Sequence, residues 1–318
     1  MYKKAFINLI NNSSIFTNLK RQAAENSLAH AYLFISQDTL AVNLIMQMLA
    51  RFSLGLQYDS VDSFNADIHL VGSADRMAAA DIGQMLDGIL IAPSKGDKKF
   101  YLMPAFGMLR TDSQSKLLKT LEEPPFGTHI LMSAYSEKTL LIPVVSRARI
   151  VVIPTFSTID IYDTLSEYAT GSTEVIKLAS EISGGNLSIA NNFLTGKIEV
   201  PAFNTCLNIL KNIVGSKAVL DASAALSVFK DNISIIFDYV ELILRDALML
   251  HLGVGHLIRL KSIKKEISKL KELYSITAIE KIIPFINKSR RRKEFNANFN
   301  SLVDEFVFMI AEFRCKYI

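Results

Sequence analysis

Apolar residues in the first half of the chain fall into short runs separated by longer amphipathic segments. Four of these runs have the length of a β-strand: residues 31–35, 100–103, 130–132 and 150–153. Each run is apolar on both faces, as strands between two helical layers must be. Helical patterns such as residues 40–52 lie between them. This alternation predicts a parallel α/β sheet with right-handed crossovers.

Residues 111–123 are predicted to form one helix that ends before a proline pair. Asp112 suits the N-terminal cap, and three leucines further on share one helical face. Pro124 and Pro125 lack amide donors and force the residue before them into extended geometry, so the helix must stop there.

The pattern becomes helical throughout after residue 154. Residues 156–200 read as short helices broken at 183–186, with Asn186 as a cap for the next helix. Pro284 is expected to kink or end one of the later helices. The later helices are predicted at 203–214, 217–229, 232–252, 256–273, 276–289 and 298–314. The chain is therefore divided into an α/β domain (1–155), a small helical domain (156–200) and an all-helical domain (201–318).

Composition excludes several classes of protein. Half of the 318 residues are apolar and 21% are charged, which excludes an intrinsically disordered chain. The net charge of +4 permits contact with nucleic acid without demanding it. Cys206 and Cys315 lie far apart, so we expect no disulfide framework, no cysteine zinc site and a reduced, cytoplasmic setting. Charged residues interrupt the longest apolar stretch, residues 233–252, so we expect no membrane span.

The most specific local signal is Leu-Leu-Lys-Thr-Leu-Glu-Glu-Pro-Pro at residues 117–125, followed by Leu-Ile-Pro-Val-Val-Ser-Arg at 141–147. Together with His-Ala-Tyr-Leu-Phe at 30–34, these motifs resemble the clamp-loader subunits of bacterial DNA polymerase III, which are AAA+ proteins. Within that family the chain looks like the delta-prime subunits, and residues 296–302 are similar to the entry into their final helix.

The resemblance implies an architecture and a set of partners. The expected fold is an AAA+-like α/β domain followed by a helical lid and an all-α collar bundle that forms the oligomer. The expected partners are the delta and gamma/tau subunits, with the sliding clamp a further candidate, and primer–template DNA reached through the assembly.

The chain departs from the family where ATP would bind. An ATP-binding member has a glycine-rich loop ending in Gly-Lys-Thr after the first strand. Residues 36–43 read Ser-Gln-Asp-Thr-Leu-Ala-Val-Asn, which places Val42 at the lysine position and Asn43 at the hydroxyl position. Asp38 would repel a triphosphate.

Two further parts of a nucleotide site are missing. Pro104 and Ala105 stand where the family has the acidic pair that organises Mg²⁺, and Ser188 stands where it has an arginine. We therefore predict that this chain uses no nucleotide cofactor and has neither ATPase nor polymerase activity of its own. The resemblance implies that it is part of a DNA polymerase III holoenzyme.

Arg147 is the main candidate for chemistry. In the family, a Ser-Arg-Cys motif carries an arginine that reaches the γ-phosphate held by the neighbouring subunit, and here the motif is Ser146-Arg147-Ala148. A planar guanidinium suits this role because it stabilises the charge that develops on a transferring phosphoryl group. The resemblance thus implies that Arg147, with Ser146, forms an arginine finger acting in trans. The alternative is a solvated surface arginine, such as Arg149.

Other sites are weaker. Residues 54–70 contain none of the cysteines of the zinc module that many family members carry, and His69 alone cannot hold zinc, so we predict no metal site. Lys119 is a candidate for contact with the DNA backbone. The basic runs at 261–271 and 289–293 could touch DNA, a partner subunit or only solvent.

Two alternative functions remain open. One is an ATPase subunit of the gamma/tau type, which ATP binding by the isolated chain would favour. The other is a scaffold or DNA-binding protein on a decayed AAA+ fold, in which Arg147 has no role.

Glu122 and Glu123 do not offer an acid–base pair, because adjacent helical residues point about 100° apart.

Overall fold

The computed structural model describes residues 2–58, 64–73, 76–169, 171–196, 200–230, 233–294 and 298–317. The chain divides into two units by its internal contacts. Unit 1 comprises residues 1–168 and 185–191, and unit 2 comprises residues 169–184 and 192–318.

Unit 1 is built on a five-stranded sheet in the order β2-β3-β4-β1-β5. The strands are β1 (Ala31–Ile35), β2 (Ile68–Leu70), β3 (Lys99–Met103), β4 (Thr128–Ala134) and β5 (Arg149–Val152). Every pairing is parallel, with Ala31 opposite Ile130 and Tyr32 opposite Arg149. The predicted parallel sheet is confirmed, and the carboxyl ends of β1, β3 and β4 meet at one edge of it.

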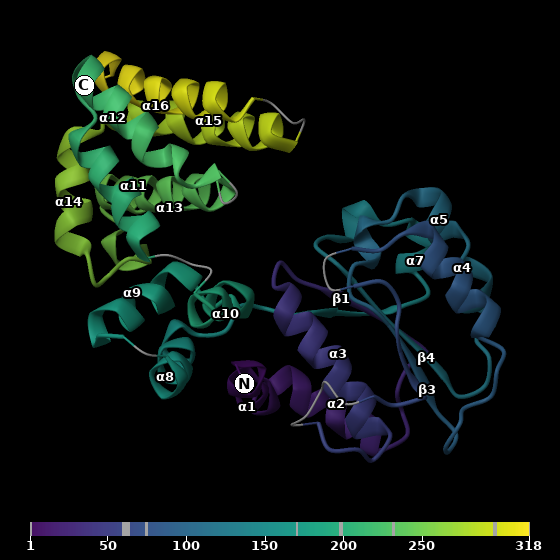
Figure 1. Cartoon of the computed structure of the whole chain (residues 1–318). Helices are drawn as coiled ribbons and strands as arrows, with labels where there is room; N and C mark the ends of the chain where they lie inside the picture. Colours follow the sequence, from purple (N-terminus) through teal and green to yellow (C-terminus); the bar gives the residue numbers. More distant parts are fainter. Residues whose placement is uncertain are drawn as a thin grey trace. The chain divides into compact units, whose positions relative to one another are not determined.

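Helices cover both faces of this sheet (Figure 1). One layer contains α1 (Tyr2–Asn11), α2 (Ser14–Ala24) and α3 (Thr39–Ser53). On that side the Tyr32 hydroxyl donates to Gln22 of α2 at 2.6 Å. The other layer contains α4 (Ala79–Gly88), η1 (Phe106–Met108), α5 (Thr111–Ser115), α6 (Leu118–Glu122), η2 (Glu137–Thr139) and α7 (Ile142–Val145). There Leu33 and Met132 of the sheet share a buried cluster with Ile82 of α4 and Val144 of α7.

Three details of unit 1 differ from the prediction. The sequence pattern missed β2, because this three-residue edge strand is mostly exposed and has no apolar run. The outer strand β5 is exposed at three of its four positions rather than apolar on both faces. The single helix predicted over 111–123 is two helices, because the amide of Leu117 bonds the carbonyl of Gln114, three residues back, and tightens the turn between them.

Unit 2 is helical. Its elements are α9 (Thr173–Ser183), α11 (Val200–Asn212), α12 (Gly215–Ser227), α13 (Ile233–His251), η4 (Gly255–Leu257), α14 (Lys264–Leu273), α15 (Ile276–Glu294) and α16 (Phe299–Lys316). Aromatic rings hold its core, with the centroids of Phe237 and Phe306 4.8 Å apart. Residues 296–297, where part of the similarity to the final family helix falls, lie outside the described residues.

Two helix predictions in unit 2 need correction. Residues 256–273 are not one helix, because the buried carboxylate of Asp246 accepts hydrogen bonds from the amides of Arg259 (2.9 Å) and Leu260 (2.7 Å) and so holds an extended segment there. Pro284 does not end its helix, since α15 continues to Glu294. Residues 289–293 therefore lie in a helix and not in a loop.

The segment predicted as a lid contributes to both units. Helix α8 (Thr158–Tyr168) belongs to unit 1, while α9 belongs to unit 2. Helix α10 (Leu187–Leu194) begins in unit 1, and the Asn186 side chain accepts from the amide of Ile189 at 3.1 Å, which confirms the predicted cap. The three-domain division with boundaries at 155 and 200 stays a prediction.

Among the described residues, no helix combines the length and apolar character that crossing a membrane requires.

Candidate functional site

The crevice at the carboxyl ends of β1, β3 and β4 is almost closed. Its walls come from the segment after β1, from the segment after β3 and from the end of β4. The remaining hollow measures about 10 Å³, which is room for about one water molecule. The residues that line it are Ser36, Thr39, Val42, Pro104, Ala105, Gly107, Met108, Ser133, Ala134 and Tyr135. This set contains no lysine, arginine or carboxylate, so it does not fit a magnesium triphosphate.

Three of the residues predicted to replace nucleotide ligands are part of this closed packing. Val42 is 2% exposed and Ala105 is 4% exposed, so both side chains belong to the core. The carbonyl of Pro104 accepts a hydrogen bond from the Ser133 hydroxyl. Apolar and internally bonded groups thus occupy the positions where the family resemblance implied a cation and metal ligands.

Asp38 is the N-cap of α3 and is 2% exposed. Its Oδ1 accepts from the amide of Ala41 (3.1 Å), the amide of Ser188 (3.1 Å) and the hydroxyl of Ser188 (2.8 Å). Its Oδ2 accepts from the amide of Leu187. One buried carboxylate therefore bonds the amino-terminal ends of both α3 and α10.

Ser188 completes this connection from the other side. Its hydroxyl oxygen accepts from the amide of Leu40 at 2.9 Å and lies 3.2 Å from the Thr39 hydroxyl. The residue predicted only as the replacement of a family arginine is thus the direct partner of Asp38. The sequence contained both residues but no signal that they meet, because they are 150 positions apart.

Arg147 lies at the surface of unit 1, just after the short helix α7. Its Nη2 donates to Oε1 of Glu122 at 2.6 Å, and its Nη1 donates to the carbonyl of Pro143 at 3.0 Å. The Ser146 hydroxyl lies 3.3 Å from Nη1 and itself donates to the carbonyl of Pro143 at 3.1 Å. The side chain of Arg147 keeps 35% of its surface exposed, so the guanidinium is ordered and accessible.

The other predicted contact residues lie on different surfaces. Lys119 is exposed on α6 in unit 1. In unit 2, Arg290 forms ion pairs with Asp238 (2.7 Å) and Glu241 (2.5 Å). Exposed lysines at 261, 264, 265, 269 and 271 line the outer side of α14 and the segment before it, while Ile267 and Leu270 of this helix are buried. The run at 289–293 is thus partly engaged within unit 2, whereas the α14 lysines face solvent.

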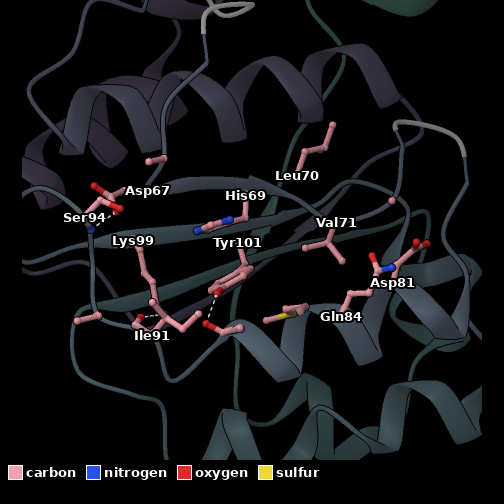
Figure 2. Close-up of a pocket in the computed structure, with 15 residues that line it drawn as sticks. Asp67, His69, Leu70, Val71, Asp81, Gln84, Ile91, Ser94, Lys99 and Tyr101 are labelled. Atoms are coloured by element: carbon pink, nitrogen blue, oxygen red, sulfur yellow. Dashed lines mark hydrogen bonds between the residues drawn. The ribbon is translucent and has the colours of Figure 1, made fainter.

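A second cavity, of about 270 Å³, lies beside the edge strand β2 (Figure 2). Asp67 and Lys99 line it, but both are partnered: the Asp67 carboxylate accepts from the amides of Ser94 (2.6 Å) and Lys95 (2.9 Å). The Lys99 ammonium points toward Ile91 and donates to the carbonyls of that residue and of Ile89. Burial lowers the pKa of Lys99, with Asp67 opposing the shift. These groups hold the loop after α4 in place.

Two histidines of unit 1 have structural partners. His69 stacks on Tyr101 at the edge of the sheet, with ring centroids 4.7 Å apart, and burial lowers its pKa. His30, predicted as a structural hydrogen-bonding residue, lies 3.1 Å through Nε2 from the carbonyl of Leu121. In the part of the chain that the structure describes, no three His, Cys, Asp or Glu residues gather as a metal site would require.

Comparison with known proteins finds similarity to subunits of DNA polymerase III. Residues 11–157 match the family described as DNA polymerase III, delta subunit. The chain is 28% identical over 160 residues to DNA polymerase III subunit tau/gamma of Haemophilus influenzae. This alignment covers 45% of this chain and 23% of that protein. It is 24% identical over 230 residues to DNA polymerase III subunit gamma of Buchnera aphidicola subsp. Baizongia pistaciae. That alignment covers 67% of this chain and 62% of the other protein.

A solved structure shows the same fold. A gamma subunit-related protein of DNA polymerase III from Thermotoga maritima superposes with a TM-score of 0.53 at 17% identity, over 94% of this chain and 99% of that one. The chain spans about a quarter of the length of the tau proteins that it matches, which are covered to 24% and 23%.

The parallel sheet and the helical unit therefore share the fold of this gamma subunit-related protein. The sequence of the chain is similar to subunits of DNA polymerase III, and the match to the delta subunit family is limited to residues 11–157.

Proposed function

We propose that this chain is a clamp-loader subunit of the delta-prime type, which neither binds nor hydrolyses ATP. The observation that carries this proposal is the closed crevice at the ends of β1, β3 and β4, whose remaining hollow of about 10 Å³ lies beside the buried Val42. The hollow left among these side chains has no room for a triphosphate with its metal.

Arg147 is the residue that acts in the proposed function. A solvent-accessible guanidinium at the surface of unit 1 can reach a phosphate on a neighbouring subunit, where it stabilises the charge of the transferring phosphoryl group. Ser146 and the Pro143 carbonyl orient the guanidinium through contacts of 3.3 and 3.0 Å. In this role the chain has no catalytic cycle of its own, and it contributes one group to a site formed by another subunit.

The proposed partners follow from the family. The delta and gamma/tau subunits would assemble with residues 201–318, the sliding clamp would be opened by the assembly, and primer–template DNA would enter it in a cytoplasmic setting. Residues 156–200 would be the lid between the two larger parts. Lys119, exposed on α6, would contact the DNA backbone.

The second candidate is an ATPase subunit of the gamma/tau type, which the names of the matched relatives favour. It would need a cation and a metal carboxylate at the crevice, and the lining residues supply neither. ATP binding by the isolated chain therefore separates the two candidates. The scaffold alternative, in which Arg147 has no role, is distinguished by whether ATP hydrolysis by the assembly depends on Arg147.

The experiment uses a loader reconstituted from this chain and its partner subunits. An arginine supplied in trans accelerates hydrolysis at the site it reaches by on the order of 10³-fold or more. Arg147→Ala should therefore remove roughly the fraction of DNA- and clamp-stimulated ATP hydrolysis that the one adjacent ATP site contributes. Arg149→Ala, two residues along the same edge, is the matched control and should retain the wild-type rate. Equal rates for wild type and Arg147→Ala in an intact assembly would remove the arginine finger from the proposal.

A further inference from the structure

The carboxylate of Asp38 lies where two helices of unit 1 present their amino-terminal ends to the same point. Helix α3 contributes the amide of Ala41, and α10 contributes the amides of Leu187 and Ser188. Unsatisfied amides and the positive end of the helix dipole make such ends favourable for an anion. The anion found there belongs to the protein itself.

Four donors converge on this carboxylate. A carboxylate offers about four acceptor positions, and Asp38 receives three amide donors and the Ser188 hydroxyl. The side chain is 2% exposed, so these bonds form away from water and leaving them unmade would be costly. Ordinary N-caps satisfy one helix, whereas this one serves two helices that are far apart in sequence.

The segment that Asp38 holds has a second anchor in unit 1. The amide of Phe156 donates to the carbonyl of Gly185 at 2.9 Å. Gly185 has a φ of +87°, and a Cβ built there would lie 1.9 Å from the carbonyl oxygen of Phe156. The amino-terminal part of residues 185–191 is therefore held twice, by a close backbone approach at Gly185 and by the Asp38 carboxylate at Leu187 and Ser188.

We infer that Asp38 is an internal anion that keeps residues 185–191 docked on unit 1 without any bound ligand, in the place where helix ends would otherwise require a phosphate or a similar oxyanion. Ser188 is its matched partner, because a hydroxyl both donates to the carboxylate and accepts from the amide of Leu40. An arginine or lysine at that position could not accept a hydrogen bond. This inference does not depend on the role of Arg147.

The test measures hydrogen exchange in the full chain, peptide by peptide. In Asp38→Ala, the amides of Leu187 and Ser188 should exchange at least about tenfold faster than in wild type, because their acceptor is gone. Amides in the sheet core, such as those of residues 130–132, should keep their protection. Asn298→Ala is the matched control: Asn298 caps only α16, in unit 2, through a bond of 3.2 Å to the amide of Ser301. It should leave residues 185–191 unchanged.

Chemical rescue makes the test specific for an anion. Formate at tens of millimolar should restore much of the protection at residues 187–188 of Asp38→Ala, while chloride at equal ionic strength should not, because only formate reproduces the planar carboxylate. Ser188→Ala keeps the carboxylate and should give a smaller acceleration, so it remains informative if Asp38→Ala fails to fold. Wild-type exchange at residues 187–188 in both variants would overturn the inference, and so would equal rescue by formate and chloride.

Discussion

Arg147 and Glu122 form an ion pair at the surface of unit 1, with Nη2 of the arginine 2.6 Å from Oε1 of the glutamate. Both residues fall in the two motifs that carry the family resemblance, and they are 25 positions apart. Their side chains keep 35% and 51% of their surface exposed. Such a pair contributes only about 0.2–1 kcal/mol to stability, so its main effect is to fix the direction of the guanidinium.

Removing Glu122 should therefore alter activity more than stability. In a reconstituted loader, Glu122→Ala should lower stimulated ATP hydrolysis about two- to fivefold, because the guanidinium loses part of its orientation. The free energy of unfolding should change by less than about 1 kcal/mol. Glu123→Ala is the control, since its exposed side chain is the immediate neighbour. An effect of Glu122→Ala that persisted undiminished in the Arg147→Ala background would show that Glu122 does not act through Arg147.

Lysine should not replace Arg147. A guanidinium donates to Glu122 and to the Pro143 carbonyl through two different nitrogens, whereas an ammonium is a single point of charge. Arg147→Lys should therefore retain the melting temperature of wild type and lose most of the activity that Arg147→Ala loses. Full activity with lysine would mean that positive charge alone suffices and that the planar geometry is not used.

Within the basic run at 289–293, Arg290 should stabilise the fold and should not bind DNA. Its side chain is 27% exposed, and its guanidinium pairs with both Asp238 and Glu241 of α13. Arg290→Ala should lower the free energy of unfolding by about 0.5–1 kcal/mol and leave the affinity of the chain for DNA unchanged. Arg291→Ala, at an exposed neighbouring position, should be neutral in stability. Loss of DNA affinity in Arg290→Ala at wild-type stability would reverse this assignment.

The two cysteines should react very differently in the folded chain. Cys206 is 0% exposed in the core of unit 2, and burial raises the pKa of its thiol to about 12. Cys315 is exposed on α16. Because the thiolate is the reactive form, a thiol reagent at pH 8 should modify Cys315 alone, and Cys206 only after denaturation. Mass spectrometry of labelled peptides measures this directly, and rapid native labelling of Cys206 would contradict the packing of α11.

The sequence predicted the sheet because four of its strands lie in apolar runs, and it predicted most helices from their periodicity. It failed where long-range contacts decide the backbone. The extended segment after η4 exists because Asp246 captures the amides of Arg259 and Leu260, and nothing local marks that contact. Helix α15 continues through Pro284 because isoleucines at positions 279, 282 and 286 are fully buried along it.

The candidate site could be predicted only in part, because local motifs are visible in the sequence and long-range contacts are not. The motif at 146–147 and the altered loop at 36–43 are local, so the sequence alone singled them out. The pairing of Arg147 with Glu122 and that of Asp38 with Ser188 join distant segments, and a single sequence contains no record of them. The local sequence predicts only a repulsive charge at Asp38, whereas the structure gives its carboxylate four hydrogen-bond donors.

The account is tested most directly by calorimetric titration of the isolated chain with MgATP. A closed crevice lined by Val42, Pro104 and Ala105 predicts no saturable heat up to millimolar nucleotide and no rise in melting temperature. A ligand at one hundred times its dissociation constant would instead stabilise the fold by about 2.7 kcal/mol. Saturable binding in the micromolar range, lost in a variant such as Val42→Phe that fills the hollow further, would contradict the account and favour an ATPase subunit.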